Sequence, residues 1–336
     1  MKLLTNIEKS ELIRAIPKRI ETANKGTYGK TLIIAGSEGM CGAAFLSGLA
    51  AYRSGAGLVK LLTVDSNRSI LQSLLPEAII ETYAEGMDLN ELISRNLFWA
   101  DFIVMGPGMG TTELSIRVVK YVLGKLSLIS GQALKLRPRG LRLLVDADGL
   151  NILSMDPEAM RVFDVTADKI PVIITPHPME MSRLSGREPA EIIEHAEACA
   201  LEFSEAHHVM VLLKGSNTVI MDAALSLKFI NHQASPALSK GGSGDVLSGC
   251  IAGIAEILHS PEHPGAAGAA SPENRGAADF ARRKELLYAG SIGSLVLSVA
   301  GEKASLRYGE HGVLARNTAD ELGKILDELR LSIENT

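Results

Sequence analysis

Cysteine is scarce in this sequence, and the cysteines that it has are far apart. There are three, Cys41, Cys199 and Cys250, and none belongs to a CxxC pair. This number and spacing exclude a disulfide framework and give no ligand pattern typical of a zinc site. We therefore expect a cytoplasmic protein, kept in a reducing compartment.

Aromatic residues and basic charge are also in short supply. Aromatic side chains make up 4% of the 336 residues, and the formal net charge is −5. The sequence thus offers neither a basic footprint nor many base-stacking side chains, so we expect no nucleic-acid partner. No uncharged run is long enough to span a bilayer, and charges interrupt the N-terminal 20 residues, unlike a signal peptide. We expect no membrane association.

What the sequence does contain is an alternation of short apolar runs and helical patterns in a globular composition, 46% hydrophobic and 22% charged. The predicted strands are residues 31–37, 57–65, 102–108, 141–148, 171–178 and 209–221. The predicted helices are residues 42–55, 111–126 and 190–208. Continuous apolar strands joined by helices predict an α/β fold with a mostly parallel central sheet, flanked by helices on both faces. No break in composition divides the chain, so we expect one domain over residues 1–336.

Residues 259–285 differ from the rest of the chain. They are rich in Pro, Gly, Ala and Ser and have little apolar patterning. This composition predicts a surface loop or disordered excursion. A second predicted excursion is residues 130–140.

The stretch "LSKGGSGDVLSGCIAG", residues 238–253, joins a Gly-rich turn to an apolar helical stripe. The stripe predicts a helix that begins near Ser243. Its first-turn N–H groups have no intrahelical partners, and the glycines Gly241, Gly242 and Gly244 leave them open to an anion. The turn is therefore a candidate phosphate site.

Asp245 in this turn has two interpretations. An acidic residue in the first turn is favourable in any helix because of the macrodipole. A carboxylate beside a phosphate site is also suited to accept the proton of a hydroxyl that attacks a phosphoryl group. The residues alone leave both open.

Further polar or Gly-rich loops follow the predicted strands: "AGSEGMCGA" (35–43), "MGPGMG" (105–110), "DADGLN" (146–151), "TPHPME" (175–180) and "LLKGSNT" (212–218). In a parallel sheet these loops meet at the carboxyl edge, where ligands bind. Each also has a purely structural interpretation. The first two fit plain turns, Asp148 and Glu180 fit helix caps, and Lys214 fits a solvated hairpin turn.

In this order, the loops resemble those of the ADP/ATP-dependent NAD(P)H-hydrate dehydratases, members of the ribokinase-like superfamily. The resemblance covers nearly the whole chain. It rests on "KGTYGKTLIIAGS", "GAAFLSGLAAYRSGAGLV", "GPGMG", "DADGLN", "TPHPMEMSRL", "KGSNT" and "GGSGDVLSGCIAG". It implies a ribokinase-like fold and a hydro-lyase that repairs the S epimer of hydrated NADH or NADPH. ADP or ATP, with Mg²⁺, would phosphorylate the C6 hydroxyl, and the departure of phosphate would restore the double bond.

The resemblance also implies roles for single residues. The catalytic turn would be Gly242, Ser243, Gly244 and Asp245. Substrate would be contacted by Ala43, Gly108, His177 and Asp245. The nucleotide would be bound by Lys214, Gly215, Ser216, Asn217, Thr218 and Gly244. Asp146 and Glu180 are the candidate metal ligands. By analogy with bacterial members, ADP is the expected phosphoryl donor. The resemblance also implies a homo-oligomer, which we expect to be a tetramer.

Three departures from the family and two rival functions complete the prediction. Ser243 stands where the family often has Thr, and the hydroxyl is kept. Residues 259–285 form a longer excursion than the family implies. The dehydratase blocks begin by Lys25, so we expect no N-terminal epimerase domain and no epimerase activity. The first rival is a ribokinase-like kinase for a thiazole or pyrimidine alcohol, which would stop at the phosphoester. The second is a nucleotide-binding regulatory module without turnover.

Overall fold

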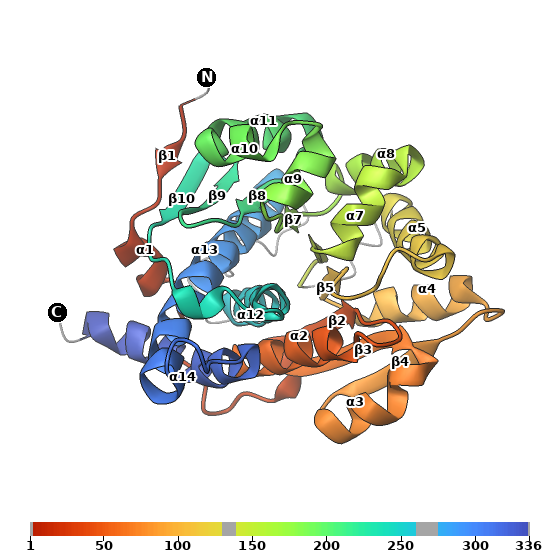
Figure 1. Ribbon diagram of the computed structural model, residues 1–336, viewed down its shortest axis with the longest axis horizontal. Helices are drawn as coiled ribbons and strands as arrows, with labels where there is room; N and C mark the ends of the chain where they lie inside the picture. The colour runs from red at the N-terminus through yellow and green to blue at the C-terminus, as the bar shows by residue number, and fades with distance from the viewer. Residues whose placement is uncertain (1–2, 130–138, 260–274, 335–336) are drawn as a thin grey trace.

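The computed structural model describes residues 3–129, 139–259 and 275–334, and a ten-stranded sheet runs through its centre (Figure 1). The strands are β1 (Thr5–Asn6), β2 (Lys30–Ile34), β3 (Leu58–Val64), β4 (Ile79–Tyr83), β5 (Phe102–Met105), β6 (Arg142–Val145), β7 (Val172–Ile174), β8 (Met210–Leu213), β9 (Thr218–Asp222) and β10 (Leu227–Asn231). Their order across the sheet is β1-β10-β9-β8-β7-β6-β5-β2-β3-β4. Among the strand pairs of the described residues, only β8–β9 and β9–β10 are antiparallel, so the predicted, mostly parallel sheet is confirmed.

The central strands are apolar at successive positions because helices cover both faces of the sheet. All four residues of β5, β6 and β8 are buried. Side chains alternate between the two faces along a strand, so such a run supplies a core on each side. Two large apolar clusters result. One includes Ile33, Val104 and Leu144, and the other includes Leu32, Ile103 and Leu143.

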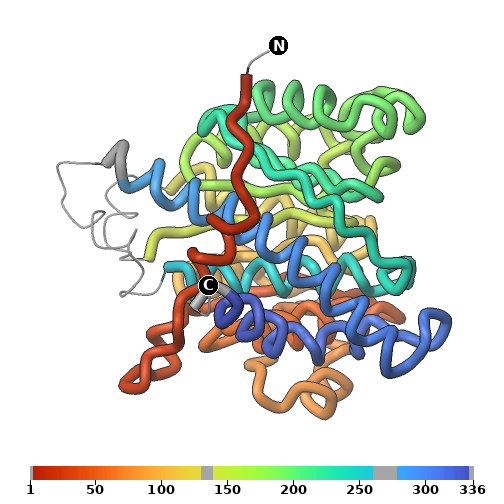
Figure 2. The backbone as a smooth tube through the Cα atoms, turned by 90° about the vertical axis from the view of Figure 1, so that its left-hand side faces the viewer, coloured from red at the N-terminus to blue at the C-terminus, as the bar shows by residue number. Residues whose placement is uncertain are grey.

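The helices divide between these two faces. They are α1 (Lys9–Arg14), α2 (Cys41–Arg53), α3 (Arg68–Leu74), α4 (Leu89–Trp99), α5 (Glu113–Ser127), α7 (Asp148–Met155), α8 (Pro157–Ala167), α9 (Pro178–Ser185), α10 (Pro189–Glu194), α11 (Ala196–His207), α12 (Ser243–Leu258), α13 (Arg275–Tyr308) and α14 (Ala315–Glu334). Helices α2, α12 and α13 pack on one face, and α4, α5, α8 and α11 pack on the other (Figure 1). Helix α14 folds back along α13, as Figure 2 shows.

Helix α12 lies at the heart of the first layer. Every residue from Val246 to Leu258 is buried. It packs closely on α2 because Gly249 and Gly253 have no side chains: a Cβ atom at Gly249 would lie 2.0 Å from the carbonyl oxygen of Ser47. This packing fixes the position of the N-terminus of α12, which begins at Ser243 as predicted.

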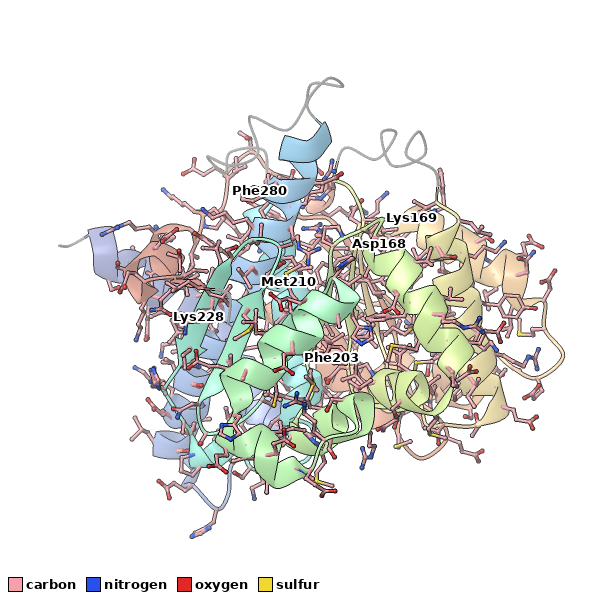
Figure 3. The ribbon with its side chains drawn as sticks, turned by 90° about the horizontal axis from the view of Figure 1, so that it is seen from above. Asp168, Lys169, Phe203, Met210, Lys228 and Phe280 are labelled. Atoms are coloured by element: carbon pink, nitrogen blue, oxygen red, sulfur yellow. The ribbon has the colours of Figure 1, made fainter. Side chains whose placement is uncertain are left out.

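Two sequence predictions need correction. The predicted strand 209–221 is a hairpin, β8 and β9, because "KGSN" turns the chain between two apolar runs. Of the predicted excursion 259–285, residues 260–274 lie outside the described residues, but Arg275–Glu285 is helical and forms the first turns of α13. Phe280 lies on this part of the helix (Figure 3). The polar side chains here have partners, since Arg283 pairs with Asp222 and Glu285 with His259. Of the second predicted excursion, residues 130–138 also lie outside the described residues.

Candidate functional site

The Gly-rich turn before α12 presents unpaired amides. Gly242 is the N-cap with φ of 94°, a left-handed conformation that favours glycine. The Ser243 amide donates to the carbonyl oxygen of Lys240 (3.2 Å). The next two amides, of Gly244 and Asp245, have no acceptor among the residues that the structure describes. The predicted phosphate site therefore has two free N–H donors at the positive end of a buried helix.

Asp245 lies on the first turn of this helix, next to those amides. Its carbonyl oxygen accepts a hydrogen bond from Ser47 Oγ on α2 (3.1 Å), which helps to fix the turn. Burial raises the pKa of the Asp245 carboxyl to about 7, with a further rise from Asp146 and Asp148 that Lys214 opposes. The residue is thus a carboxylate that titrates near neutral pH, as a proton acceptor requires.

Three charged side chains converge beside Asp245 from segments that follow three different strands, β6, β7 and β8. Lys214 Nζ lies 2.9 Å from Asp146 Oδ1 and 3.7 Å from Glu180 Oε2. Burial alone would lower the pKa of the Lys214 ammonium, but Asp146 and Glu180 outweigh it and raise the pKa. Burial raises the pKa of Glu180, and Lys214 opposes the shift. The lysine therefore stays charged, with its ammonium held between two carboxylates.

Ser248 completes this cluster; it lies within the stretch 238–253, but the sequence analysis gave it no role. Its hydroxyl donates to Asp146 Oδ2 (2.7 Å), so the buried Asp146 carboxylate is held by a lysine on one oxygen and a serine on the other. The cluster lies directly against the Gly-rich turn, since a Cβ atom at Gly244 would lie 3.6 Å from Lys214 Nζ and 3.8 Å from Asp146 Oδ2. The available signal was a polar residue at position 248, inside an apolar stripe and one turn beyond Gly244.

The turn after Asp146 is strained. Ala147 has φ of 48° and ψ of −118°, an unfavourable conformation for a residue with a Cβ atom. Asp148 begins α7 but does not cap it as the sequence suggested. Its Oδ2 accepts from the amide of Gly110 (2.8 Å), so it ties the "MGPGMG" loop to the "DADGLN" loop.

His177 caps α9 through its side chain. Its Nδ1 accepts from the amides of Met179 (3.1 Å) and Glu180 (3.3 Å), while Glu180 Oε2 accepts from the His177 amide (2.8 Å). Because Nδ1 is an acceptor, the hydrogen bonds assign the ring proton to Nε2, which lies 3.3 Å from Glu180 Oε1. Burial, Lys214 and Arg183 lower the pKa of His177, in agreement with a neutral ring.

Ala43 and Gly108, predicted to contact substrate, are neighbours. Gly108 has φ of 59°, and a Cβ atom there would lie 2.6 Å from Cβ of Ala43. The "MGPGMG" loop is held to the loop after β2, since the amide of Gly36 donates to the carbonyl oxygen of Pro107 (2.8 Å). Only glycine allows this close approach of the two loops.

The loop between β8 and β9, Lys214–Asn217, separates two clefts. The first, which we call the serine cleft, measures about 580 Å³ and is lined by Ser216, Thr218, Ser235, Ser239, Ser243, Gly244, Leu247, Ser294 and Ser298, among others. It joins the predicted nucleotide-binding loop to the free amides of α12. Residues 233–236, which the sequence analysis had not selected, also line it. The available signal was a polar, Pro-containing segment shortly before the Gly-rich turn.

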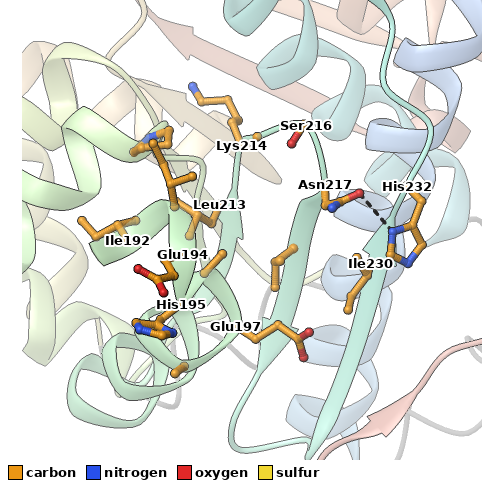
Figure 4. Close-up of a pocket in the computed structure, with 16 residues that line it drawn as sticks. Ile192, Glu194, His195, Glu197, Leu213, Lys214, Ser216, Asn217, Ile230 and His232 are labelled. Carbon is orange, nitrogen blue, oxygen red and sulfur yellow. Dashed lines mark hydrogen bonds between the residues drawn. The ribbon is translucent and has the colours of Figure 1, made fainter. Parts of the chain in front are cut away.

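The second cleft, which we call the histidine cleft, lies on the other side of the same loop and measures about 640 Å³. Figure 4 shows Glu194 and His195 on one wall, facing His232 across the opening. His232 Nδ1 lies 3.0 Å from Asn217 Oδ1. Of the predicted nucleotide-binding residues, Lys214, Gly215 and Ser216 line both clefts, Thr218 lines the serine cleft and Asn217 the histidine cleft.

The candidate metal ligands Asp146 and Glu180 do lie together, but the Lys214 ammonium occupies the space between them. Within residues 3–129, 139–259 and 275–334, no group of three or more His, Cys, Asp or Glu side chains is arranged to hold a metal ion. The pair thus does not fit a protein-held metal centre.

No helix in the described part of the chain is long and apolar enough to cross a membrane.

Comparison with known proteins gives concordant matches. A family model described as NAD(P)H-hydrate dehydratase matches residues 31–294. An ADP-dependent (S)-NAD(P)H-hydrate dehydratase of Lactiplantibacillus plantarum is 30% identical over 247 residues, which are 74% of this chain and 79% of that protein. A bifunctional NAD(P)H-hydrate repair enzyme of Moorella thermoacetica is 30% identical over 328 residues, 95% of this chain but 53% of that protein. The chain thus spans about half the length of the bifunctional relatives that it matches.

Solved structures show the same fold. A ribokinase-like superfamily protein of Enterococcus faecalis superposes with a TM-score of 0.71 at 22% identity, covering 96% of this chain and 95% of that chain. An ADP/ATP-dependent NAD(P)H-hydrate dehydratase of Bacillus subtilis, co-crystallised with ATP and Mg²⁺, gives a TM-score of 0.68 at 24% identity, covering 97% and 99%. The ribokinase-like fold predicted from the sequence is confirmed.

Proposed function

Because the chain belongs to the NAD(P)H-hydrate dehydratase family, we propose that it dehydrates the S epimer of hydrated NADH or NADPH at the expense of ADP or ATP. The observation that carries the proposal is the position of Asp245. Its carboxyl, with a pKa raised to about 7 by burial and by Asp146, lies beside two free amides and the Lys214 ammonium. A proton acceptor and an anion site thus share one helix turn.

The first step of the proposed reaction is phosphoryl transfer. Asp245 accepts the proton of the C6 hydroxyl while the hydroxyl oxygen bonds to the terminal phosphorus of the nucleotide, and the bond to the bridging oxygen breaks. The amides of Gly244 and Asp245 donate to the phosphoryl oxygens as charge develops on them. Lys214, held charged by Asp146 and Glu180, adds a positive charge at the same place.

The second step is elimination. The bond between C6 and the phosphate oxygen breaks, the neighbouring ring carbon gives up its proton to the departing phosphate, and the ring double bond forms. Asp245 returns the proton that it accepted in the first step to solvent. Phosphate is a good leaving group where hydroxide is a poor one, so the first step makes the second feasible. ADP would leave as AMP, or ATP as ADP, with one phosphate released per turnover.

The nucleotide belongs in the serine cleft under this proposal. The cleft is lined by Lys214–Ser216 and Thr218 and also by Gly244, whose amide has no acceptor within the described residues. Mg²⁺, when bound with the nucleotide, would neutralise charge on its phosphate oxygens. Because Lys214 already occupies the space between Asp146 and Glu180, we assign no metal ligand to the protein.

The test is an assay on the S epimer of hydrated NADH with ADP or ATP, following the return of reduced-nicotinamide absorbance together with phosphate release. We expect equal amounts of both. A parallel reaction supplies a thiazole or pyrimidine alcohol in place of hydrated NADH. A stable phosphoester of that alcohol, with no recovery of absorbance from hydrated NADH, would identify the rival kinase instead. Nucleotide binding with neither product would identify a regulatory module.

Asp245→Asn is the decisive variant. Since it removes the proton acceptor and keeps the size of the side chain, we expect kcat to fall by roughly 10²- to 10⁴-fold. Nucleotide binding, measured by titration calorimetry, should change little. Glu205→Gln, at an exposed position on α11, is the matched control. Near-normal turnover of Asp245→Asn would remove this residue from the mechanism.

We also propose that residues 1–336 form one ribokinase-like domain, that the protein is cytoplasmic, and that it assembles as a homotetramer. The fold, the three scattered cysteines and the family support these proposals. Size-exclusion chromatography with light scattering tests the assembly, and a monomer would refute it.

A further inference from the structure

The histidine cleft lies outside the chemistry described so far but opens directly beside it. It shares Lys214, Gly215 and Ser216 with the serine cleft, and it is also lined by Pro178, the residue after His177. A ligand in this cleft would therefore touch the reaction site from the side opposite the nucleotide.

We propose that the histidine cleft holds the adenosine end of the hydrated dinucleotide and that Glu194 makes the enzyme prefer hydrated NADH to hydrated NADPH. This inference rests on the function proposed above. It assigns a place to the half of the substrate that does not react, and it names the side chain that distinguishes the two substrates.

The order of the strands supports this placement. Gly108, His177 and Lys214 follow β5, β7 and β8, and β5, β6, β7 and β8 are neighbours in the sheet. Three steps of about 4.8 Å between strands separate the Gly108 loop from the Lys214 loop by roughly 14 Å. This is comparable to the length of an extended dinucleotide. With the nicotinamide ring near Ala43 and Gly108, the diphosphate would pass His177 and the adenosine would reach the histidine cleft.

The lining of the cleft suits a nucleoside. Leu213, Val219, Ile193 and Ile230 are among its lining residues, so it offers an apolar surface to a flat base. Figure 4 shows Leu213 and Ile230 on opposite sides of the cleft. His195 and Ser216 also line it and supply hydrogen-bonding groups. The volume, about 640 Å³, is ample for an adenosine.

The charge of the cleft points to a ribose with a free 2′-hydroxyl. Three charged side chains line it, and two are neutralised: Lys214 by Asp146 and Glu180, and Glu197 by Lys228. Glu194 makes no ion pair with any residue that the structure describes. A carboxylate is a good acceptor for a ribose 2′-hydroxyl, as in NAD-binding sites, and it repels a 2′-phosphate.

The experiment compares three hydrated substrates: reduced NAD, reduced NADP and reduced nicotinamide mononucleotide, which lacks the adenosine half. We expect the wild type to have a higher kcat/KM for hydrated NADH than for hydrated NADPH. Glu194→Gln should reduce that preference about tenfold, and Glu194→Arg should reverse it. Neither variant should change the kcat/KM for the hydrated mononucleotide or the KM for ADP. Glu205→Gln, exposed on α11 and outside the cleft, is the control.

The outcomes separate this inference from the proposed function. If the wild type dehydrates all three substrates but the Glu194 variants leave the NADH to NADPH ratio unchanged, the adenosine site is wrong and the function stands. The same conclusion follows if the variants impair the hydrated mononucleotide as strongly as the dinucleotides. If the wild type dehydrates none of the three, the proposed function itself fails.

Discussion

The acidity of Asp245 depends on its neighbours, and the pH profile of the enzyme should depend on them too. Burial and the facing Asp146 raise its pKa to about 7, while Lys214 opposes the shift. A base that is active when deprotonated gives a rate that rises with pH through its pKa. We therefore expect kcat/KM of the wild type to rise around pH 7.

Asp146→Asn should move this rise to lower pH. The substitution removes a negative charge that faces Asp245 and frees Lys214 from its nearest carboxylate, and both changes lower the pKa of Asp245. We expect a shift of roughly one pH unit. The measurement is kcat/KM against pH. Asp148→Asn, which removes a weaker contribution, should shift the profile less. An unchanged or upward shift in Asp146→Asn would contradict this account.

The same carboxyl should reduce the stability of the free enzyme at high pH. An acid whose pKa is raised by folding loses stability as the pH rises from its unfolded value, about 3.9, toward its folded value. Asp245→Asn should therefore be more stable than the wild type at pH 8, by at most roughly 4 kcal/mol. The gain should shrink steadily as the pH is lowered to 5. Urea unfolding without nucleotide checks this, and an equal difference at both pH values would refute it.

Single residues were predictable from the sequence where a loop motif marked them, and not where only folding brings groups together. The Gly-rich turn indicated Asp245, and "TPHPME" indicated His177. Asp146 and Lys214 are 68 positions apart, so nothing local shows that they pair. Ser248 looks like part of an apolar stripe until Asp146 is placed against it.

At the scale of elements, the residue before α9 has two roles: His177 caps the helix and is also a predicted substrate contact. His177 accepts two amide hydrogen bonds at the N-terminus of the helix. His177→Ala should destabilise the protein by about 1 kcal/mol because the cap is lost. His177→Asn, whose side chain is a good cap, should keep the stability but lose the Nε2–H group. We expect Asn to restore the melting temperature and not the KM for substrate. Recovery of both would leave His177 with a structural role only.

The packing of α12 on α2 is a second property of elements with a testable consequence. At Gly249 a methyl group would lie 2.0 Å from the carbonyl oxygen of Ser47, so Gly249→Ala must push the helices apart. We expect a loss of about 1–3 kcal/mol, with reduced activity because Ser47 also holds Asp245. Gly124→Ala on α5, where a Cβ atom meets nothing within 4 Å, is the control and should be neutral or slightly stabilising. Denaturant titration gives the free energy of unfolding of both variants, and an equal effect of the two substitutions would contradict this account.

Elements were predictable where composition and period agreed. Helices α2, α5 and α12 match their predicted ranges within a few residues. Strands β4 and β10 were missed because polar residues interrupt them, as in "IIETY" and "LKFIN". The first turns of α13 were missed because their partners, such as Asp222 for Arg283, are distant in sequence.

For the whole molecule, the end of the sheet opposite the site is held by a buried ionic cluster. Glu256, near the C-terminus of α12, binds Arg139 (2.8 Å) and Arg142 (3.3 Å), and Arg142 and Glu256 are fully buried. Glu256→Met would leave the buried Arg142 guanidinium without its carboxylate. We expect a loss of about 3–5 kcal/mol in the free energy of unfolding.

A neutral pair of substitutions tests whether the cluster acts by charge. Arg142→Met together with Glu256→Met should cost less than Glu256→Met alone, since neither charge then remains unpaired at position 142 or 256. The pH dependence of kcat/KM should be the same in both variants as in the wild type. A double variant less stable than the single one would show that the side chains stabilise by packing instead.

The parallel order of the sheet followed from the continuous apolar strands, but the sequence of strands across it did not. That order depends on which face of the sheet each connecting helix crosses, and the sequence does not show this. Helices α13 and α14 follow the last strand, so no strand pattern indicates where they pack. The convergence of loops at one edge was nevertheless predictable, because it requires only that the strands be parallel.

Helix α12 carries the free amides at its first turn and the ionic cluster near its last. In an α-helix each residue turns the chain by about 100°. One inserted or deleted residue between Gly244 and Glu256 would rotate the two ends of the helix relative to each other. Either the free amides would then turn away from the site, or Glu256 would turn away from Arg139 and Arg142. In relatives that share both features, insertions and deletions should therefore occur only outside the segment between Gly244 and Glu256. The spacing of 12 residues between these two positions should be constant and can serve to align their sequences.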